Sequence, residues 1–264
     1  MSIVYSIILG IVEGITEFLP ISSTAHLIIT SRILEIAQTD FVKMFEIVIQ
    51  LGAIAAVAVL YFKLLIKNPQ LIGKIIAAFI PTSIIGLAVY SFAKRYLLGN
   101  LWITVIALIV GGLGIILFEM KYKNRLEDAS YKNDSSGLNS HISYPAAIWM
   151  GVCQAVAIIP GVSRSAATIL GGRAWGITRT AVVEFSFLLA APTMFAAAAL
   201  DIYKNPQALT GGNIIPLIIG FVVAFVVAYV SMKWLISYIQ KHSFTAFGWY
   251  RILVGALVWV LFLR

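Results

Sequence analysis

Six apolar stretches, each about as long as a bilayer is thick, constrain this chain most strongly. A helix needs about 20 apolar residues to cross the hydrocarbon core of a membrane. The stretches lie at residues 42–62, 71–93, 101–119, 180–200, 214–236 and 244–263. The composition agrees, because only 11% of the 264 residues are charged, against about 25% in an average soluble protein. We therefore predict an all-α polytopic membrane protein.

Two further apolar stretches are interrupted by polar elbows. Residues 3–34 are broken at Pro20, and residues 145–175 are broken at Pro160. Non-helical backbone at membrane depth is tolerated only where protein or water covers it. Each stretch is therefore predicted to form a re-entrant hairpin of two half-helices. Polar residues follow both breaks, namely Ser22, Ser23, Thr24, Ser163, Arg164 and Ser165.

The two halves of the chain resemble each other in sequence. A single offset places residues 21–25 on residues 162–166, so that the polar elbows coincide. We predict one membrane domain made of two repeats, residues 1–120 and 145–264, joined by a polar linker at 121–144. Each repeat would hold one re-entrant hairpin and three spans. An odd number of spans forces opposite orientations, which is the inverted-repeat plan of many transporters.

The basic residues indicate an orientation rather than a nucleic-acid partner. The net charge is +8, but no basic cluster with interleaved aromatic residues is present, so nucleic-acid binding is not expected. With the N-terminus outside, most Lys and Arg residues of the loops fall on one face. The positive-inside rule assigns that face to the cytoplasm.

Two acids lie within the first apolar stretch. Glu13 and Glu17 are four residues apart and share a helix face. Two carboxylates this close repel each other, so one takes a proton or both face a cation. An acid pair at a water-exposed helix end is the simpler alternative. The sharper interpretation is a site that binds a divalent cation or handles protons.

The hydroxyls of the first elbow are followed by a histidine. Capping of a helix accounts for at least one of Ser22, Ser23 and Thr24. His26 lies one helical turn beyond Ser23, so its imidazole could activate a hydroxyl or protonate a leaving group. A structural histidine is the alternative.

The second elbow has the composition of an anion site. Backbone N–H groups at the start of a half-helix bind anions, and Arg164 suits phosphate through bidentate hydrogen bonds. A structural ion pair between Arg164 and Glu13 or Glu17 is the alternative. Elsewhere, Glu46 and Gln50 share a face of a span, and we expect Arg251 in the last span to pair with an acid.

Both elbows resemble signatures of the bacterial undecaprenyl-diphosphate phosphatase family, also called the bacitracin-resistance proteins. The first signature has two acids spaced by three residues and is similar to residues 13–26. The second reads Pro-Gly-x-Ser-Arg-Ser-x-x-Thr and matches residues 160–168 in full. The resemblance covers essentially the whole chain.

This resemblance implies hydrolysis of the terminal phosphate of undecaprenyl diphosphate, a membrane lipid. The product is the lipid carrier reused in peptidoglycan assembly, and overproduction would confer resistance to bacitracin. The resemblance also implies an inverted-repeat fold, a divalent cation such as Mg²⁺ or Ca²⁺, and a site that faces the outside of the bacterial plasma membrane. A lipid or ion transporter is the competing function, and a homodimer is left open.

Residue roles follow from the resemblance together with the chemistry of phosphoryl transfer. Glu13 and Glu17 would hold the cation, or Glu17 would act as a base. Ser23, with His26, is the predicted nucleophile, and a water activated by Glu17 or His26 is the alternative. The residues predicted to bind the diphosphate are Arg164, Ser163, Ser165 and Thr168, with Ser22, Thr24, Glu46 and Gln50 as further substrate-binding residues.

Overall fold

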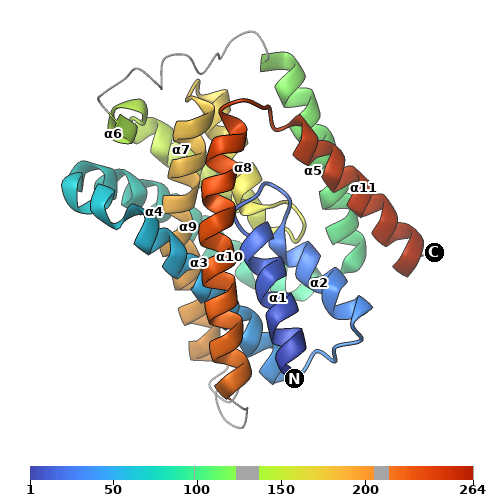
Figure 1. Ribbon diagram of the computed structural model, residues 1–264. Helices are drawn as coiled ribbons and strands as arrows, with labels where there is room; N and C mark the ends of the chain where they lie inside the picture. The colour runs from blue at the N-terminus through green and yellow to red at the C-terminus, as the bar shows by residue number, and fades with distance from the viewer. Residues whose placement is uncertain (98, 123–136, 205–213, 264) are drawn as a thin grey trace.

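Six long helices form the body of the protein. A computed structural model describes residues 1–97, 99–122, 137–204 and 214–263, and all regular structure in them is helical (Figure 1). The long helices are α3 (Asp40–Lys67), α4 (Pro69–Phe92), α5 (Leu101–Tyr122), α9 (Arg179–Lys204), α10 (Ile214–Ile239) and α11 (Thr245–Phe262). All six are long and apolar enough to cross a membrane. The predicted spans are therefore confirmed, and the protein is an all-α, multi-pass membrane protein.

The two interrupted stretches form helical hairpins, as predicted. The first elbow lies between α1 (Ile3–Thr16) and α2 (Ser23–Ile33). The second follows α7 (Tyr144–Ala155) and a short 3₁₀ turn, η3 (Val156–Ile158), and precedes α8 (Arg164–Ala174). Both elbows lie within the bundle rather than at its ends (Figure 1). Proline and the residues around it break these helices because proline has no backbone N–H to donate.

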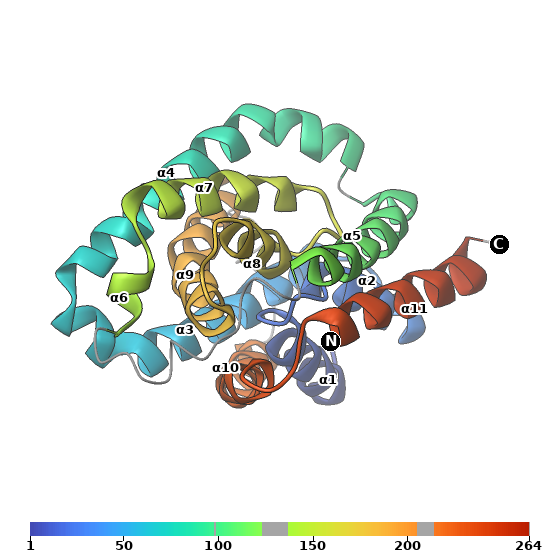
Figure 2. The same cartoon turned by 90° about the horizontal axis from the view of Figure 1, so that it is seen from above.

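The predicted polar linker is only partly described. Helix α5 continues to Tyr122, a short helix α6 spans Gly137–His141, and α7 already begins at Tyr144, so both ends of the predicted linker are helical. Residues 123–136 lie outside the described residues. A π-helical segment, η1 (Ala93–Leu97), extends α4. Seen from above, α4 curves around α7 and α9 (Figure 2).

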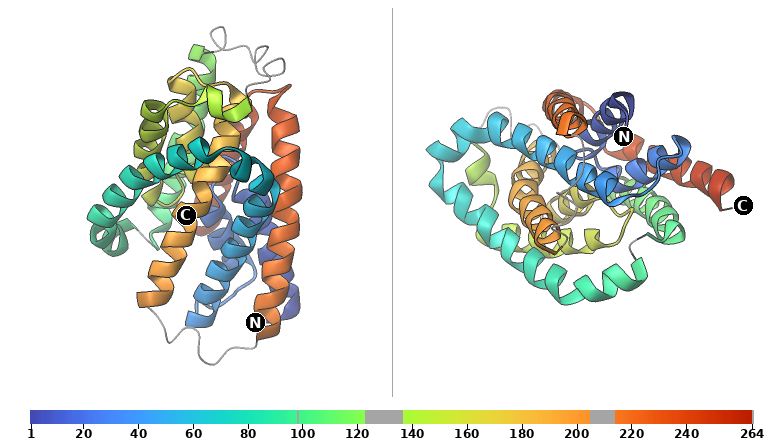
Figure 3. Two further views of the ribbon diagram at one scale, coloured as in Figure 1. Left: turned by 90° about the vertical axis from the view of Figure 1, so that its left-hand side faces the viewer. Right: turned by 90° about the horizontal axis from the view of Figure 1, so that it is seen from below.

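The two hairpins correspond in their helix bounds. The offset that aligns the two elbows in sequence also relates the start of α7 to the start of α1, and both ends of α8 to those of α2. Ser22 and Ser163, which the same offset relates, share a positive φ of 74°. Packing is reciprocal, because α1 packs on α10 and α7 packs on α4; α1 and α10 lie side by side in the view from below (Figure 3). The opposite orientation of the two halves in the membrane stays a prediction.

Small residues let these helices approach closely. A Cβ atom added at Gly151 would lie 1.9 Å from the carbonyl oxygen of Ala78, where α7 meets α4. A Cβ added at Gly112 would lie 2.6 Å from the carbonyl oxygen of Gly248, where α5 meets α11. Helix association in lipid depends on such close van der Waals packing. The first contact holds the second hairpin against α4, and the second joins two of the long helices.

Candidate active site

A cavity of about 170 Å³ lies between the two elbows. Its walls include Met194 of α9, Ala157 and Ile159 of the second hairpin, and Gln50 of α3. The predicted site residues that line it are Glu17, Ser22, Ser23, Thr24, Gln50, Ser163 and Arg164. The fold therefore brings together polar residues that the sequence separates by more than half of the chain.

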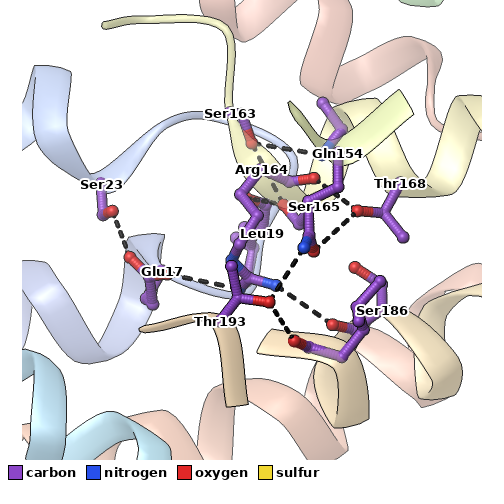
Figure 4. A network of polar contacts seen from close by, with 12 residues as sticks. Glu17, Leu19, Ser23, Gln154, Ser163, Arg164, Ser165, Thr168, Ser186 and Thr193 are labelled. Atoms are coloured by element: carbon purple, nitrogen blue, oxygen red, sulfur yellow. Dashed lines mark hydrogen bonds and ion pairs between the residues drawn. The ribbon is translucent and has the colours of Figure 1, made fainter. Parts of the chain in front are cut away.

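Glu17 connects the two elbows (Figure 4). Its Oε2 accepts a hydrogen bond from the Ser23 hydroxyl, and its Oε1 lies 3.3 Å from Nη2 of Arg164. Arg164 also donates from Nη1 to the Ser186 carbonyl of α9, over 3.1 Å. The side chains of Arg164 and Glu17 are only 12% and 6% exposed, so little water screens this ion pair. A hydroxyl, a carboxylate and a guanidinium thus form a continuous array at the cavity.

The start of each second half-helix is set by a serine with left-handed backbone. Ser22 precedes α2 and Ser163 precedes α8. The Ser163 hydroxyl accepts from the Ala166 N–H at 3.3 Å and caps α8, whereas the Ser22 hydroxyl does not cap α2. Both helices therefore begin at the cavity. The first N–H groups of a helix create a positive potential that favours anions.

Ser165 and Thr168 are placed differently from the prediction that they hold the diphosphate. Neither lines the cavity, and both are fully buried. The Ser165 hydroxyl donates to the Leu19 carbonyl of the first elbow at 2.8 Å. The Thr168 hydroxyl donates to the Arg164 carbonyl at 2.9 Å and lies 3.3 Å from Oε1 of Gln154. Their hydroxyls stabilise the elbows instead of facing the cavity.

His26 does not pair with Ser23, so that part of the prediction is wrong. Its Nδ1 lies 2.8 Å from the Ser22 carbonyl oxygen, and its Nε2 lies 2.8 Å from the Tyr250 hydroxyl. A carbonyl only accepts, so Nδ1 carries the hydrogen and Nε2 accepts from Tyr250. Burial lowers the pKa of His26, and a lower pKa favours this neutral form of the ring. Ser23 meets Glu17 because the elbow turns it back to the end of α1.

Glu13 is a buried carboxylate beside Glu17. It is 1% exposed, and among the described residues neither of its oxygens has a hydrogen-bond partner. Glu17, Glu46 and Arg164 are its charged neighbours, so Glu46 lies near Glu13 without lining the cavity. An uncompensated buried carboxylate is costly, and carboxylate oxygens suit Mg²⁺ and Ca²⁺. Glu13 and Glu17 therefore fit a divalent cation, and a proton shared between the two carboxyl groups would satisfy the pair as well.

The cation would need further ligands. No group of three or more His, Cys, Asp or Glu side chains that could hold a metal ion is found among the described residues. Mg²⁺ in enzymes is commonly held by one or two carboxylates together with substrate phosphates. Waters, hydroxyls or phosphate oxygens would have to complete the coordination of a cation at these two carboxylates.

Arg251 does not pair with an acid in the described part of the chain, contrary to expectation. Its guanidinium is fully buried and donates to backbone carbonyls of both elbows and of α5. The acceptors are Pro20, Gly161, Val162, Ala107 and Leu108. Sequence reasoning missed this role because a carbonyl acceptor exists at every residue and leaves no mark in the sequence.

Comparison with known proteins agrees with this geometry. A family model described as Bacitracin resistance protein BacA matches residues 6–257. A protein named undecaprenyl-diphosphatase from Aquifex aeolicus is 48% identical, and the match covers 98% of each chain. Proteins of the same name from Sulfurihydrogenibium sp. and Methanococcus aeolicus are 46% and 42% identical, with at least 98% of each chain covered. The chain therefore belongs to the bacitracin resistance protein BacA family.

Proposed function

We propose that this protein hydrolyses the terminal phosphate of undecaprenyl diphosphate, giving undecaprenyl phosphate and inorganic phosphate. Family membership and the name shared by the relatives support this activity. The observation that carries it is the array of Ser23, Glu17 and Arg164 at one cavity. Hydrolysis would remove the diphosphate lipid that bacitracin sequesters, which agrees with the description of the family as bacitracin resistance proteins. A transporter function is not favoured, because the relatives carry an enzyme's name.

The cavity suits the terminal phosphate of the lipid. Arg164 lines it, and a guanidinium binds phosphate oxygens through charge-assisted hydrogen bonds. Helices α2 and α8 both begin there and add their N-terminal N–H groups. Phosphoryl transfer depends mainly on positioning and on neutralising negative charge. The apolar tail would stay in the lipid that surrounds the six spans.

Ser23 is the proposed nucleophile and Glu17 the proposed base. The Ser23 oxygen attacks the terminal phosphorus while its proton passes to Oε2 of Glu17. The bond between this phosphorus and the bridging oxygen breaks, and undecaprenyl phosphate leaves with the electron pair and the proton from Glu17. Water then attacks the phosphoserine, its proton passes through Glu17, and Ser23 and inorganic phosphate are released. Direct attack by a water that Glu17 activates is the alternative.

Glu13 and Glu17 are the proposed ligands of a divalent cation, Mg²⁺ or Ca²⁺, and this role of Glu17 is the alternative to its role as the base. When bound, the cation would supply positive charge against the diphosphate. The absence of hydrogen-bond donors at the buried Glu13 oxygens among the described residues supports this proposal. We further propose that the cavity opens to the outside of the bacterial plasma membrane and that the two halves are inverted repeats. The reciprocal packing of the hairpins supports the second point.

Phosphate release from undecaprenyl diphosphate by the purified protein in detergent tests the function. We expect cation-dependent release by the parent and loss of release in Arg164→Ala. Arg95→Ala, at an exposed arginine of η1, is the matched control and should keep full activity. If the folded parent releases no phosphate with any cation, the proposed hydrolysis is wrong. If Arg164→Ala matches the parent, Arg164 does not bind the phosphate.

A further inference from the structure

Arg251 of α11 contacts both elbows. Its Nη2 donates to the Gly161 carbonyl at 2.8 Å, and its Nη1 donates to the Val162 carbonyl at 2.8 Å. The same Nη1 donates to the Pro20 carbonyl of the first elbow at 3.2 Å. Two more bonds reach α5, to Ala107 at 3.0 Å and Leu108 at 3.4 Å. One guanidinium thus joins the two hairpins to a pair of membrane-spanning helices.

The contacted carbonyls lie next to the proposed catalytic residues. Pro20 lies between Glu17 and Ser23, and Gly161 lies three residues before Arg164. The offset that aligns the two elbows also places Pro20 on Gly161, so Arg251 contacts the corresponding peptide of each hairpin. A carbonyl held by a hydrogen bond fixes the plane of its rigid peptide. Arg251 therefore constrains the backbone from which the catalytic side chains project.

Arg251 does not reach the cavity itself. Its side chain has no exposed area, and it is not among the residues that line the cavity. The guanidinium fits against α5 because residue 111 is a glycine: a Cβ atom added at Gly111 would lie 2.1 Å from Nη2 of Arg251. Any effect on the reaction must therefore pass through the elbows.

The burial of Arg251 is difficult to explain as a contribution to stability alone. Among the described residues it forms no ion pair with a carboxylate. Removing a cation from water is costly, and well-packed apolar residues often replace buried charges without loss of stability. A guanidinium offers five donors in a fixed plane, which apolar packing cannot supply. Compared with apolar packing, the Arg251 guanidinium additionally orients the carbonyls that it contacts.

We propose that Arg251 is a positioning residue that holds the two elbows in the geometry that aligns Ser23, Glu17 and Arg164. This inference rests on the proposed hydrolysis for its effect on rate, but its effect on the elbows is independent of activity. It acts through Pro20, Gly161 and Val162 and does not touch the substrate.

The first test is Arg251→Lys, which keeps the charge but replaces three donor nitrogens by one ammonium, so that it cannot keep all five carbonyl contacts. We expect kcat per folded protein to fall about 100-fold with KM little changed, because small misplacements of reacting groups are that costly. Arg173→Lys is the matched control, since Arg173 is 1% exposed and donates to the Ile177 carbonyl beyond the far end of α8. An Arg251→Lys protein with the kcat of the parent overturns the proposal.

The second test measures the elbows directly. Spin labels at Ile15, near the end of α1, and at Val156, both exposed, would be placed in a Cys153→Ser background. We expect a narrow distance distribution in the parent and in Arg173→Lys, and a broader one in Arg251→Lys. Gly111→Ala keeps Arg251 but displaces its guanidinium, so it should broaden the distribution too. This variant replaces Arg251→Lys in the test if Arg251→Lys does not fold.

The two tests separate the proposal from the proposed function. Broadening in the variants, with a parent that releases no phosphate, would support the elbow contacts while the hydrolysis fails. An active parent whose distance distribution is unchanged in Arg251→Lys and Gly111→Ala would overturn the proposal and leave the hydrolysis standing.

Discussion

The Ser23 hydroxyl donates a hydrogen bond to Oε2 of Glu17, the residue that caps the C-terminus of α1. The other oxygen of the same carboxylate faces Arg164 across the cavity. One carboxylate is therefore shared between a hydroxyl of the first elbow and a guanidinium of the second. A shift of either elbow would disturb both contacts, so the nucleophile, the base and the phosphate-binding group depend on one another.

Ser23→Ala removes the proposed nucleophile and leaves the carboxylate in place. We expect kcat to fall at least about 1,000-fold, as loss of a nucleophile does in other covalent mechanisms. Acid quenching with labelled terminal phosphate should trap a phosphorylated parent and no phosphorylated variant. Ser237→Ala, on the exposed face of α10, is the control. Full activity in Ser23→Ala would replace the serine nucleophile by a water that Glu17 activates.

Glu13→Gln tests the proposed cation site. A chelator should abolish phosphate release by the parent, and Mg²⁺ or Ca²⁺ should restore it. Because the variant loses one of two anionic ligands, we expect the cation concentration for half-maximal activity to rise at least about tenfold. The cation should also raise the unfolding temperature of the parent more than that of the variant.

Glu35→Gln, at an exposed acid after α2, is the matched control for Glu13→Gln. It should keep the cation requirement of the parent. Equal cation requirements in Glu13→Gln and the parent would place the metal, if one is needed, elsewhere.

The spans and the hairpins could be predicted because their signals are local. The length of an apolar stretch decides whether it can cross a membrane. Pro20 and Pro160 could be recognised as breaks because polar residues follow each of them closely, whereas Pro81 and Pro192 lie inside α4 and α9. Membership of the site was largely predictable for the same reason, since the polar residues of an elbow at membrane depth need a protein environment. Most of them line the cavity.

The partners within the site could not be predicted from spacing. His26 lies one turn from Ser23, but its ring meets Tyr250 in α11, the last helix of the chain. Ser165 carries a hydroxyl that could bind phosphate, yet this hydroxyl donates a hydrogen bond to the Leu19 carbonyl. Each of these contacts depends on how segments from different halves of the chain pack together. Contacts of that kind require the tertiary structure.

Gly161→Ala tests whether the second elbow needs the positive φ of Gly161 and its close approach to α5. Gly161 has a φ of 94°, and an added Cβ would lie 2.4 Å from the Thr104 carbonyl oxygen of α5. We expect the free energy of unfolding to fall by about 2 kcal/mol, from the left-handed backbone and the clash together, and kcat to fall with it. Thermal unfolding in detergent and phosphate release measure the two effects.

Gly176→Ala separates the backbone effect from the clash. Gly176 has the same φ of 94°, but an added Cβ meets nothing within 4 Å. This variant should be destabilised less and should keep its kcat. If both variants behave alike, the contact between the second elbow and α5 does not matter for activity.

The half-buried, neutral His26 predicts a pH dependence of stability. Burial lowers the pKa of His26 below its usual 6.5 in the folded protein, so the unfolded chain takes up this proton first as the pH falls. Stability should therefore decline as the pH falls through about 6.5 and level off below the folded pKa. Thermal unfolding of the parent between pH 5 and 8 measures this decline, and His26→Gln should reduce it.

His242→Gln is the matched control, because His242 makes a similar contact to the carbonyl four residues earlier from an exposed position. A decline that persists unchanged in His26→Gln would assign the proton uptake to another group and would remove the argument for a neutral ring at Tyr250.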